Sequence, residues 1–188
     1  MTTITNISSG AKKLLPAFIL ITLGIAARFL PHPANFAPIG AIAIFSGLYL
    51  PKKWALILPL AAMLVSDLFI GFYSLPIMTS VYAGFIIMGL IGLAVRKNKK
   101  LSTVLGGTIL GSVVFYLLTN GAVWAFGSLY PHTAAGLLQS YVMAIPFFRN
   151  SLFGDLLYTG ALVGAYETSL VLSFGHSVST GHRVSISK

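Results

Sequence analysis

Long apolar runs, separated by short polar or basic segments, dominate this sequence. Such runs predict helices, and they cover residues 14–30, 36–50, 54–70, 77–95, 103–126 and 151–172. Because about 20 apolar residues cross a hydrocarbon core about 30 Å thick, most of these runs are long enough to span a membrane. The second run is short for that purpose, so we expect its neighbours to shelter it. The pattern predicts an all-α membrane protein, a bundle of six transmembrane helices.

Prolines mark several boundaries between and within these runs. Residues 31–35, with two prolines, predict a turn, because a residue before proline is pushed out of the helical region. Asn35 is suited to be the N-cap of the second helix. Pro59 predicts a kink in the third helix. A cleaved signal peptide is an alternative reading of the first run, although Arg28 directly after Ala26 and Ala27 makes a poor cleavage site.

The connection between the fifth and sixth runs, residues 127–150, has an apolar pattern of its own. Its apolar residues fit one face of a helix of about 12 residues; they are Ala134, Leu137, Leu138, Tyr141, Val142 and Ile145. A helix of that length is too short to span a bilayer. We therefore expect a short interfacial or re-entrant helix on the outer face, with a seventh span as the alternative.

Composition supports a membrane protein of one domain. The chain has 188 residues, of which 56% are hydrophobic and 8% charged, with a mean hydropathy of +0.90. A soluble domain carries about 25% charged residues. The sequence contains no cysteine, which excludes disulfides, thiolate metal sites and a cysteine nucleophile.

The basic residues that give the net charge of +9 lie between the apolar runs. They do not gather on one face that could bind nucleic acid. With six spans and the N-terminus inside, the cytoplasmic segments hold nearly all basic residues: Lys12, Lys13, Lys52, Lys53, Arg96, Lys97, Lys99, Lys100, Arg183 and Lys188. This distribution obeys the positive-inside rule. We therefore expect a cytoplasmic segment at 1–13, a six-helix transmembrane domain at 14–172 and a flexible cytoplasmic tail at 173–188, in the inner membrane of a bacterium.

Threading the helices alternately through the membrane brings distant polar residues to the same depth. Arg28, Asp67 and Asn120 come to the outer ends of their helices, level with residues 149–155 at the start of the last helix. Intramembrane ionisable groups usually mark functional sites. The alternative is that the charged groups form structural salt bridges. Glu167 lies roughly 18 Å deeper than Asp155, near the cytoplasmic interface.

A stripe on the fifth helix adds an amide between two aromatic side chains. Tyr116, Asn120 and Trp124 are spaced four residues apart and share one helical face. Such a stripe also occurs in ordinary helix packing, but a buried amide needs a partner. The candidate ligand-binding residues are therefore Arg28, Asn35, Asp67, Tyr116, Asn120, Trp124, Arg149, Asn150 and Asp155. Their two positive and two negative charges suit a zwitterionic or neutral polar ligand.

Several segments resemble an uncharacterised family of small bacterial inner-membrane proteins described as transport proteins. The segments are residues 28–38 (RFLPHPANFAP), Ser66-Asp67 with Gly71, Leu118-Thr119-Asn120 with Trp124, Tyr130-Pro131 with Thr133, and residues 145–155. The resemblance covers about residues 14–165. Members of that family are similar to the substrate-binding (S) components of energy-coupling factor (ECF) vitamin transporters.

The resemblance implies a solute-binding subunit of an uptake transporter. Such a subunit would bind a vitamin-like molecule near the outer face and work with a transmembrane coupling subunit and cytoplasmic ATPases. This sequence has no Walker-type phosphate loop, so a partner would hydrolyse ATP. We expect no cofactor, no metal and no catalytic residue in this chain. One departure concerns docking: Ala27 is followed four residues later by Pro31, where S components often carry a second small residue.

Two other classes of function stay open. A scaffold subunit would pack partner helices against the glycine-rich face of Gly106, Gly107 and Gly111. An intramembrane aspartyl enzyme would use Asp67 and Asp155 as a dyad. The residues around these aspartates depart from the glycine-aspartate protease pattern, however, because Ser66 stands in place of tyrosine and Leu152 in place of glycine. We therefore expect no enzyme.

Overall fold

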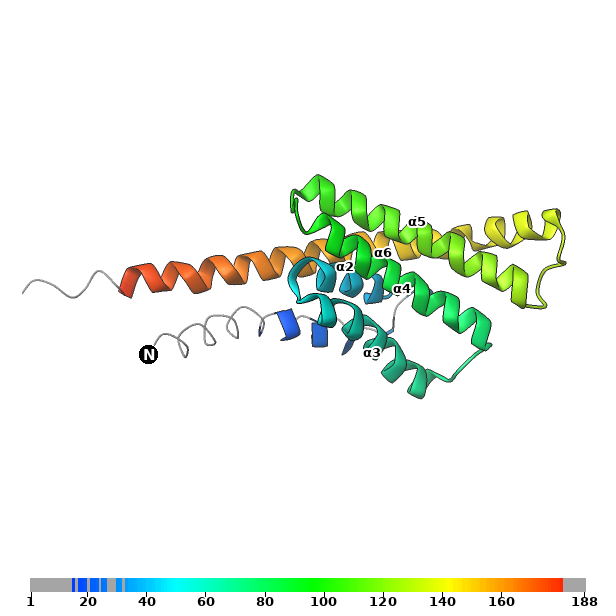
Figure 1. Ribbon diagram of the computed structural model, residues 1–188, viewed down its shortest axis with the longest axis horizontal. Coiled ribbons are helices and arrows are strands. Elements are labelled where there is room, and N and C mark those ends of the chain that lie inside the picture. Colours follow the sequence, from blue (N-terminus) through cyan, green and yellow to red (C-terminus); the bar gives the residue numbers. More distant parts are fainter. Residues whose placement is uncertain are drawn as a thin grey trace, which may run out of the picture.

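The computed structural model describes residues 15–180 apart from 16, 20, 24, 27–29 and 32, with side chains as far as residue 172 except at residue 70. The described residues form helices and no strands, which confirms the all-α class. The helices are α2 (Ile39–Tyr49), α3 (Lys52–Ile70), α4 (Leu75–Val95), α5 (Leu101–Phe126) and α6 (Ala134–Thr180), preceded by helical residues between 15 and 26 (Figure 1).

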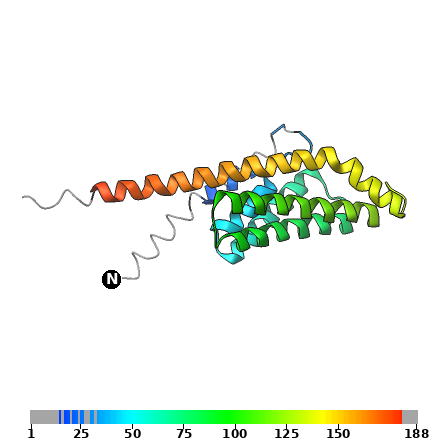
Figure 2. The same ribbon diagram turned by 90° about the horizontal axis from the view of Figure 1, so that it is seen from above.

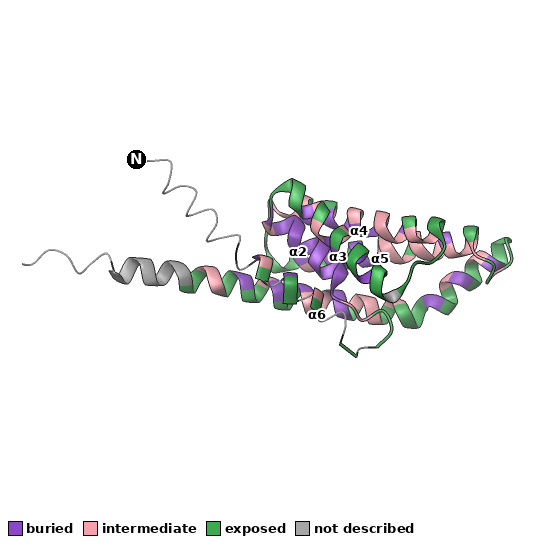
Figure 3. Ribbon diagram, turned by 90° about the horizontal axis from the view of Figure 1, so that it is seen from below, coloured by how far each residue is buried: buried purple, intermediate pink, exposed green. Residues whose placement is uncertain are grey.

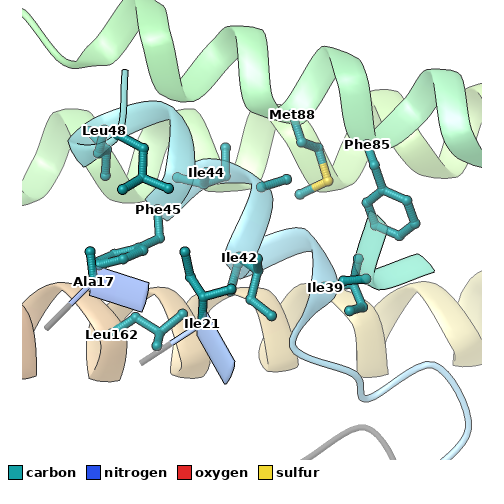
Figure 4. Close-up of a cluster of buried hydrophobic side chains, with 14 of the residues drawn as sticks. Ala17, Ile21, Ile39, Ile42, Ile44, Phe45, Leu48, Phe85, Met88 and Leu162 are labelled. Atoms are coloured by element: carbon teal, nitrogen blue, oxygen red, sulfur yellow. The ribbon is translucent and has the colours of Figure 1, made fainter. Parts of the chain in front are cut away.

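The short helix α2 lies at the centre of the bundle. Its residues from Ile39 to Leu48 are all buried, and α3, α4 and α6 surround it (Figure 3). Figure 4 shows Ile42 and Phe45 of α2 on the side that faces Ile21 of the first helical segment and Leu162 of α6. An 11-residue helix this apolar is stabilised by its neighbours on every side. The expected shelter for the second run is therefore present.

Glycines allow α2 and α4 to touch along their backbones. A Cβ atom added to Gly47 would lie 2.5 Å from the carbonyl oxygen of Gly89, and one added to Gly92 would lie 2.4 Å from that of Ile44. These distances are shorter than any ordinary carbon–oxygen contact. Close packing through small residues is the usual way in which membrane helices associate tightly. The crossing of α2 and α4 thus depends on the absence of side chains.

The loops after α2 and α4 lie at the same end of the bundle (Figure 1). The Arg96 guanidinium donates hydrogen bonds to the carbonyl oxygens of Gly47, at 2.8 Å from Nε, and of Leu50. The end of a helix leaves such carbonyls without intrahelical partners. We refer to this end, which carries Lys52, Lys53, Arg96, Lys97, Lys99 and Lys100, as the basic end.

Glu167 also lies at the basic end, near Tyr49 and Lys99. The Tyr49 hydroxyl donates to its carboxylate at 2.5 Å, and the Lys99 ammonium lies 4.2 Å from the centre of the Tyr49 ring. Burial lowers the pKa of Lys99, and the nearby Glu167 carboxylate acts in the opposite direction. Glu167 and the basic loops therefore form one polar layer.

Arg96→Met is expected to lower the free energy of unfolding by about 1.5–3 kcal/mol, the usual contribution of hydrogen bonds to a charged group. Methionine keeps most of the apolar stem but cannot bond the carbonyls of α2. Thermal unfolding in detergent micelles measures the loss, with the exposed Lys97→Met as the matched control. Equal unfolding temperatures for the two variants would contradict this role for Arg96.

The prediction of a short interfacial helix between the fifth and sixth runs is wrong. Residues 134–180 form one helix that continues through Pro146 and replaces both the separate short helix and a last helix at 151–172. Figure 2 shows a bend in the yellow part of this helix, and Pro146 lies inside the helix. Proline removes one backbone hydrogen bond and bends a helix, but it does not have to end it. The helix also extends past the basic end and includes residues 173–180 of the expected tail.

Asn35 is not the N-cap of α2, contrary to the prediction. It has a φ of 62°, in the left-handed region, and the N-cap is Pro38. Asparagine adopts this conformation more readily than most residues. The Phe36 amide donates to the Pro33 carbonyl at 3.0 Å, so this asparagine belongs to a closed turn before the helix.

Two of the described helices, α4 and α5, are long and apolar enough to cross a membrane, judged by length and composition. Helix α2 is a shorter apolar helix. The six-span topology stays a prediction.

Candidate functional site

A cavity of about 410 Å³ lies between α2, α3, α4, α5 and α6 and includes the turn before α2. Its polar lining residues are Asn35, Asp67, Tyr73, Ser112, Tyr116, Thr119, Asn120, Ser151 and Asp155. Its aromatic wall includes Phe85, Phe115, Phe147 and Phe148. The cavity begins at the N-terminal end of α2, so it lies toward the end of the bundle opposite the basic end.

Asp155 of α6 lines the cavity beside the first turn of α2. Its side chain is 6% exposed and accepts a hydrogen bond from the Ser112 hydroxyl at 2.7 Å. It also interacts with the backbone N–H of Ala41. The first amides of a helix have no intrahelical acceptor and carry a partial positive charge. Asp155 of α6 therefore supplies the capping acceptor that Pro38 cannot provide.

Gly40 makes this close approach possible. A Cβ atom at this position would lie 2.2 Å from the Asp155 carboxylate oxygen and 2.8 Å from the methyl group of Met88. Only glycine leaves room for the carboxylate beside the first turn of α2. The sequence therefore places a glycine where α2, α4 and α6 meet.

Asp67 lies on the α3 side of the cavity, near the end of that helix. Its side chain is 2% exposed and accepts a hydrogen bond from the Tyr82 hydroxyl of α4 at 2.9 Å. Transferring a carboxylate into a buried setting is costly unless hydrogen bonds satisfy it. Each buried aspartate thus lines the cavity and also accepts a hydrogen bond from a side chain of a neighbouring helix.

The α5 wall carries an amide with an unused acceptor. Asn120 donates from Nδ2 to the Tyr116 carbonyl at 2.8 Å, and in the described part of the chain its side-chain oxygen has no partner. The Tyr116 hydroxyl donates to the Tyr141 carbonyl at 2.7 Å, and its ring lies 4.6 Å from that of Phe148, centre to centre. These contacts hold the aromatic wall in place and leave one carbonyl oxygen for a ligand.

Of the residues that the sequence selects, the structure brings together Asn35, Asp67, Tyr116, Asn120 and Asp155 around the cavity. Trp124 lies apart from it and donates from its indole nitrogen to the Pro131 carbonyl at 3.1 Å. Asn150 donates to the Ala34 carbonyl at 3.0 Å. Arg28 lies outside the described residues.

Arg149 does not line the cavity and does not face a carboxylate of a described residue. Its side chain is exposed in a separate groove with Pro146, Asn150 and Phe153, and it makes no ion pair there. Arg149 precedes Asp155 by six residues, which places the two on different faces of α6. The expected pairing of Arg149 with an acidic residue of another helix is therefore not found in the part of the chain that the structure describes.

The sequence prediction missed three serine and threonine residues of the lining. Ser112 lies one turn before Tyr116 on the stripe that contains Asn120, and Ser151 lies one turn before Asp155. Extending each predicted face by one turn finds both residues. Thr119 directly precedes Asn120 in the sequence, and the helical spacing does not mark it as a lining residue.

The fold and the cavity define a class of protein: an all-helical bundle with an internal pocket of a size that suits a small molecule. More specifically, the chain belongs to a family of unknown function, DUF6580, whose model matches residues 9–174. No curated protein and no solved structure matches the chain.

Proposed function

We propose that the protein is an integral membrane protein that binds a small solute, as a subunit of an uptake transporter similar to ECF S components. The cavity of about 410 Å³ is the observation that carries this proposal. In this proposal the basic end faces the cytoplasm of a bacterium and the cavity opens toward the outer side of the inner membrane.

Exposed apolar side chains support the location in a membrane. Large hydrophobic residues are exposed on the outside of the bundle on several helices, among them Leu68, Phe69, Leu110, Leu138, Phe153 and Leu157. A soluble monomer rarely exposes large contiguous apolar patches. The concentration of lysine and arginine at one end agrees with the positive-inside rule.

The chemistry of the cavity supports binding of a small molecule. Small-molecule sites have volumes of about 300–1,000 Å³ and combine apolar walls with a few placed polar groups. Here the lining combines aromatic side chains with the Asn120 side chain and two buried carboxylates. Those polar groups come from α3, α5 and α6, so a ligand would contact three helices at once.

The alternatives fit these contacts less well. Gly107 faces Val95 and Gly111 faces Met88 inside the bundle, so two of the three glycines are already packed within the chain, and Gly106 alone is open to a scaffold partner. A catalytic aspartyl dyad needs two carboxylates that share a proton. Asp155 hydrogen-bonds Ser112 instead.

The proposal also requires partner subunits. A coupling subunit and ATPases would supply the energy for uptake, because the sequence has no phosphate-binding loop. This chain would select the solute and hold it.

The proposal is tested by looking for a small molecule in the cavity and by filling the cavity with a larger side chain. The full-length protein, purified in mild detergent, is expected to retain a small molecule that mass spectrometry detects after extraction, and to unfold at a higher temperature with one member of a vitamin panel. Ala144→Leu, in the cavity lining, should abolish both effects, whereas Ala165→Leu on the exposed side of α6 should not. Absence of any retained molecule and of any thermal shift across the panel would overturn the proposal.

A further inference from the structure

Hydroxyl groups line the α5 and α6 walls of the cavity, and their protons are used within the protein. The Ser112 hydroxyl donates to the Asp155 carboxylate at 2.7 Å. The Tyr116 hydroxyl donates to the Tyr141 carbonyl, also at 2.7 Å. Each hydroxyl has one proton to donate. A ligand that presents an acceptor to these groups would have to replace a hydrogen bond of the protein, and so would gain little.

The other hydroxyl groups of these two walls are used in the same way. Thr119 of α5 donates to the carbonyl four residues earlier in its helix at 2.8 Å, and Ser151 of α6 does so at 3.1 Å. Asn120 donates one of its two N–H groups to the Tyr116 carbonyl at 2.8 Å. Among the described lining residues of α5 and α6, the second N–H of Asn120 is thus the one hydroxyl or amide proton left for a ligand.

The side-chain oxygens of the same walls can still accept hydrogen bonds. A hydroxyl that donates its proton keeps lone pairs, and an amide oxygen has two. In the part of the chain that the structure describes, no donor reaches these oxygens, which belong to Ser112, Tyr116, Thr119, Asn120 and Ser151. Asp67 and Asp155 are not counted with them, because each already accepts a hydrogen bond from another group of the protein. The α5 and α6 walls therefore present mainly acceptors.

Aromatic rings form the apolar part of the lining. Tyr116 and Phe148 lie 4.6 Å apart, centre to centre, and Phe85 and Phe115 lie 4.8 Å apart. All four residues line the cavity. Aromatic rings pack favourably on other rings, in offset or edge-to-face arrangements. The lining thus combines surfaces that suit a flat body with oxygens that suit polar hydrogens.

We infer that the ligand of this cavity is a flat ring that carries several O–H or N–H groups, so that the ligand donates and the protein accepts. This inference rests on the proposed function, since it names the class of solute that the same cavity would bind. The Asn120 oxygen accepts one of these protons, and the Tyr116 and Thr119 oxygens accept others. The zwitterionic or neutral polar ligand predicted from the sequence relied on Arg149, which lies outside the cavity. The property that this cavity selects is the number of polar hydrogens and not the charge.

Three uncharged probes built on one ring test the direction of the hydrogen bonds. Resorcinol carries two O–H donors, 1,3-dimethoxybenzene carries oxygens that only accept, and 1,3-diethylbenzene has neither and matches the dimethoxy compound in size. Isothermal titration of the full-length protein in detergent, with empty micelles as background, measures the three affinities. We expect resorcinol to bind at least about tenfold more tightly than 1,3-dimethoxybenzene, the effect of one or two net hydrogen bonds. The molecule that co-purifies with the protein should carry at least two O–H or N–H groups.

Two pairs of variants locate the acceptors. Asn120→Leu removes the amide oxygen at nearly constant size and should weaken resorcinol binding about tenfold; Asn98→Leu, the same change at the basic end, should not. Tyr116→Phe should weaken it several-fold, whereas Tyr141→Phe, outside the described lining, should not, although each removes a hydroxyl that donates to a helix carbonyl. Affinity for 1,3-diethylbenzene, which forms no hydrogen bond, should stay the same in all four variants, so a general loss of folding would be recognised.

The outcomes separate this inference from the proposed function. Equal affinities for resorcinol and 1,3-dimethoxybenzene, or a co-purified molecule without O–H and N–H groups, would overturn the inference and leave solute binding intact. Unchanged affinity for resorcinol in both Asn120→Leu and Tyr116→Phe would also overturn it. If no probe binds, a co-purified molecule with at least two such groups supports the inference. Failure of every probe, together with the absence of a co-purified molecule, would overturn both.

Discussion

Adding one methyl group at Gly92 is expected to lower the free energy of unfolding by about 3 kcal/mol, at the upper end of the usual cost of overpacking. The new Cβ atom would lie 2.4 Å from the Ile44 carbonyl oxygen and 2.9 Å from the Cα atom of Gly47. Both are backbone atoms of α2, so no side chain can rotate to relieve the contact. The two helices would have to separate, and α2 would lose packing against α4.

A glycine on the outside of the bundle provides the control for Gly92→Ala. A Cβ atom added to Gly164 of α6 would have no neighbouring atom within 4 Å, so Gly164→Ala should leave stability unchanged or raise it by up to about 1 kcal/mol through helix propensity. Thermal unfolding in detergent, followed by circular dichroism, compares the two. If Gly92→Ala unfolds at the same temperature as Gly164→Ala, the close crossing of α2 and α4 is wrong.

Asp155→Ala is expected to lower the free energy of unfolding by about 3 kcal/mol. The substitution leaves the Ala41 amide without its acceptor, and an unsatisfied buried group costs about 1–3 kcal/mol. The Ser112 hydroxyl loses its hydrogen bond to Asp155 and keeps only the Thr108 carbonyl, at 3.0 Å, as acceptor. It also removes the acceptor that stabilises the positive end of α2. The loss should appear as a lower unfolding temperature in detergent.

Asp155→Asn distinguishes the effect of the hydrogen-bond acceptor of Asp155 from the effect of its negative charge. Asparagine keeps an oxygen that can accept a hydrogen bond from Ser112, so most of the stability should remain. An Asp155→Ala protein as stable as the unsubstituted protein would contradict the capping role. Equal loss of stability in both variants would show that the negative charge, and not the acceptor, stabilises α2.

The bounds of the middle helices follow closely from the sequence because turn signals are strong there. Pro51 precedes α3, and Gly71, with a φ of 108°, follows it, so the chain can turn at both positions. The last helix departs further from its predicted bounds because Pro146 and the polar residues after it resemble a helix boundary. Proline restricts the chain locally, but helical residues on both sides continue one helix.

The sequence predicts the depth of the site residues better than the direction in which they point. Alternate threading of helices brings Asp67, Asn120 and Asp155 to one level, and the structure places all three around one cavity. The side of the helix on which a residue lies is harder to derive when a helix is apolar all round, since no polar face determines its rotation. Trp124 and Arg149 lie outside the cavity for that reason.

Under the proposed function, the short length of α2 limits the kind of transport in which this chain would take part. Its 11 residues extend about 16 Å, roughly half of a hydrocarbon core about 30 Å thick. In the proposed orientation a solute that enters from outside stops near the middle of the bilayer, and α2 closes the remaining half of the path. The buried packing of α2 opposes its displacement. Under the proposed function, the protein alone would bind the solute without conducting it, and release to the cytoplasm would require a partner that moves the whole bundle or α2.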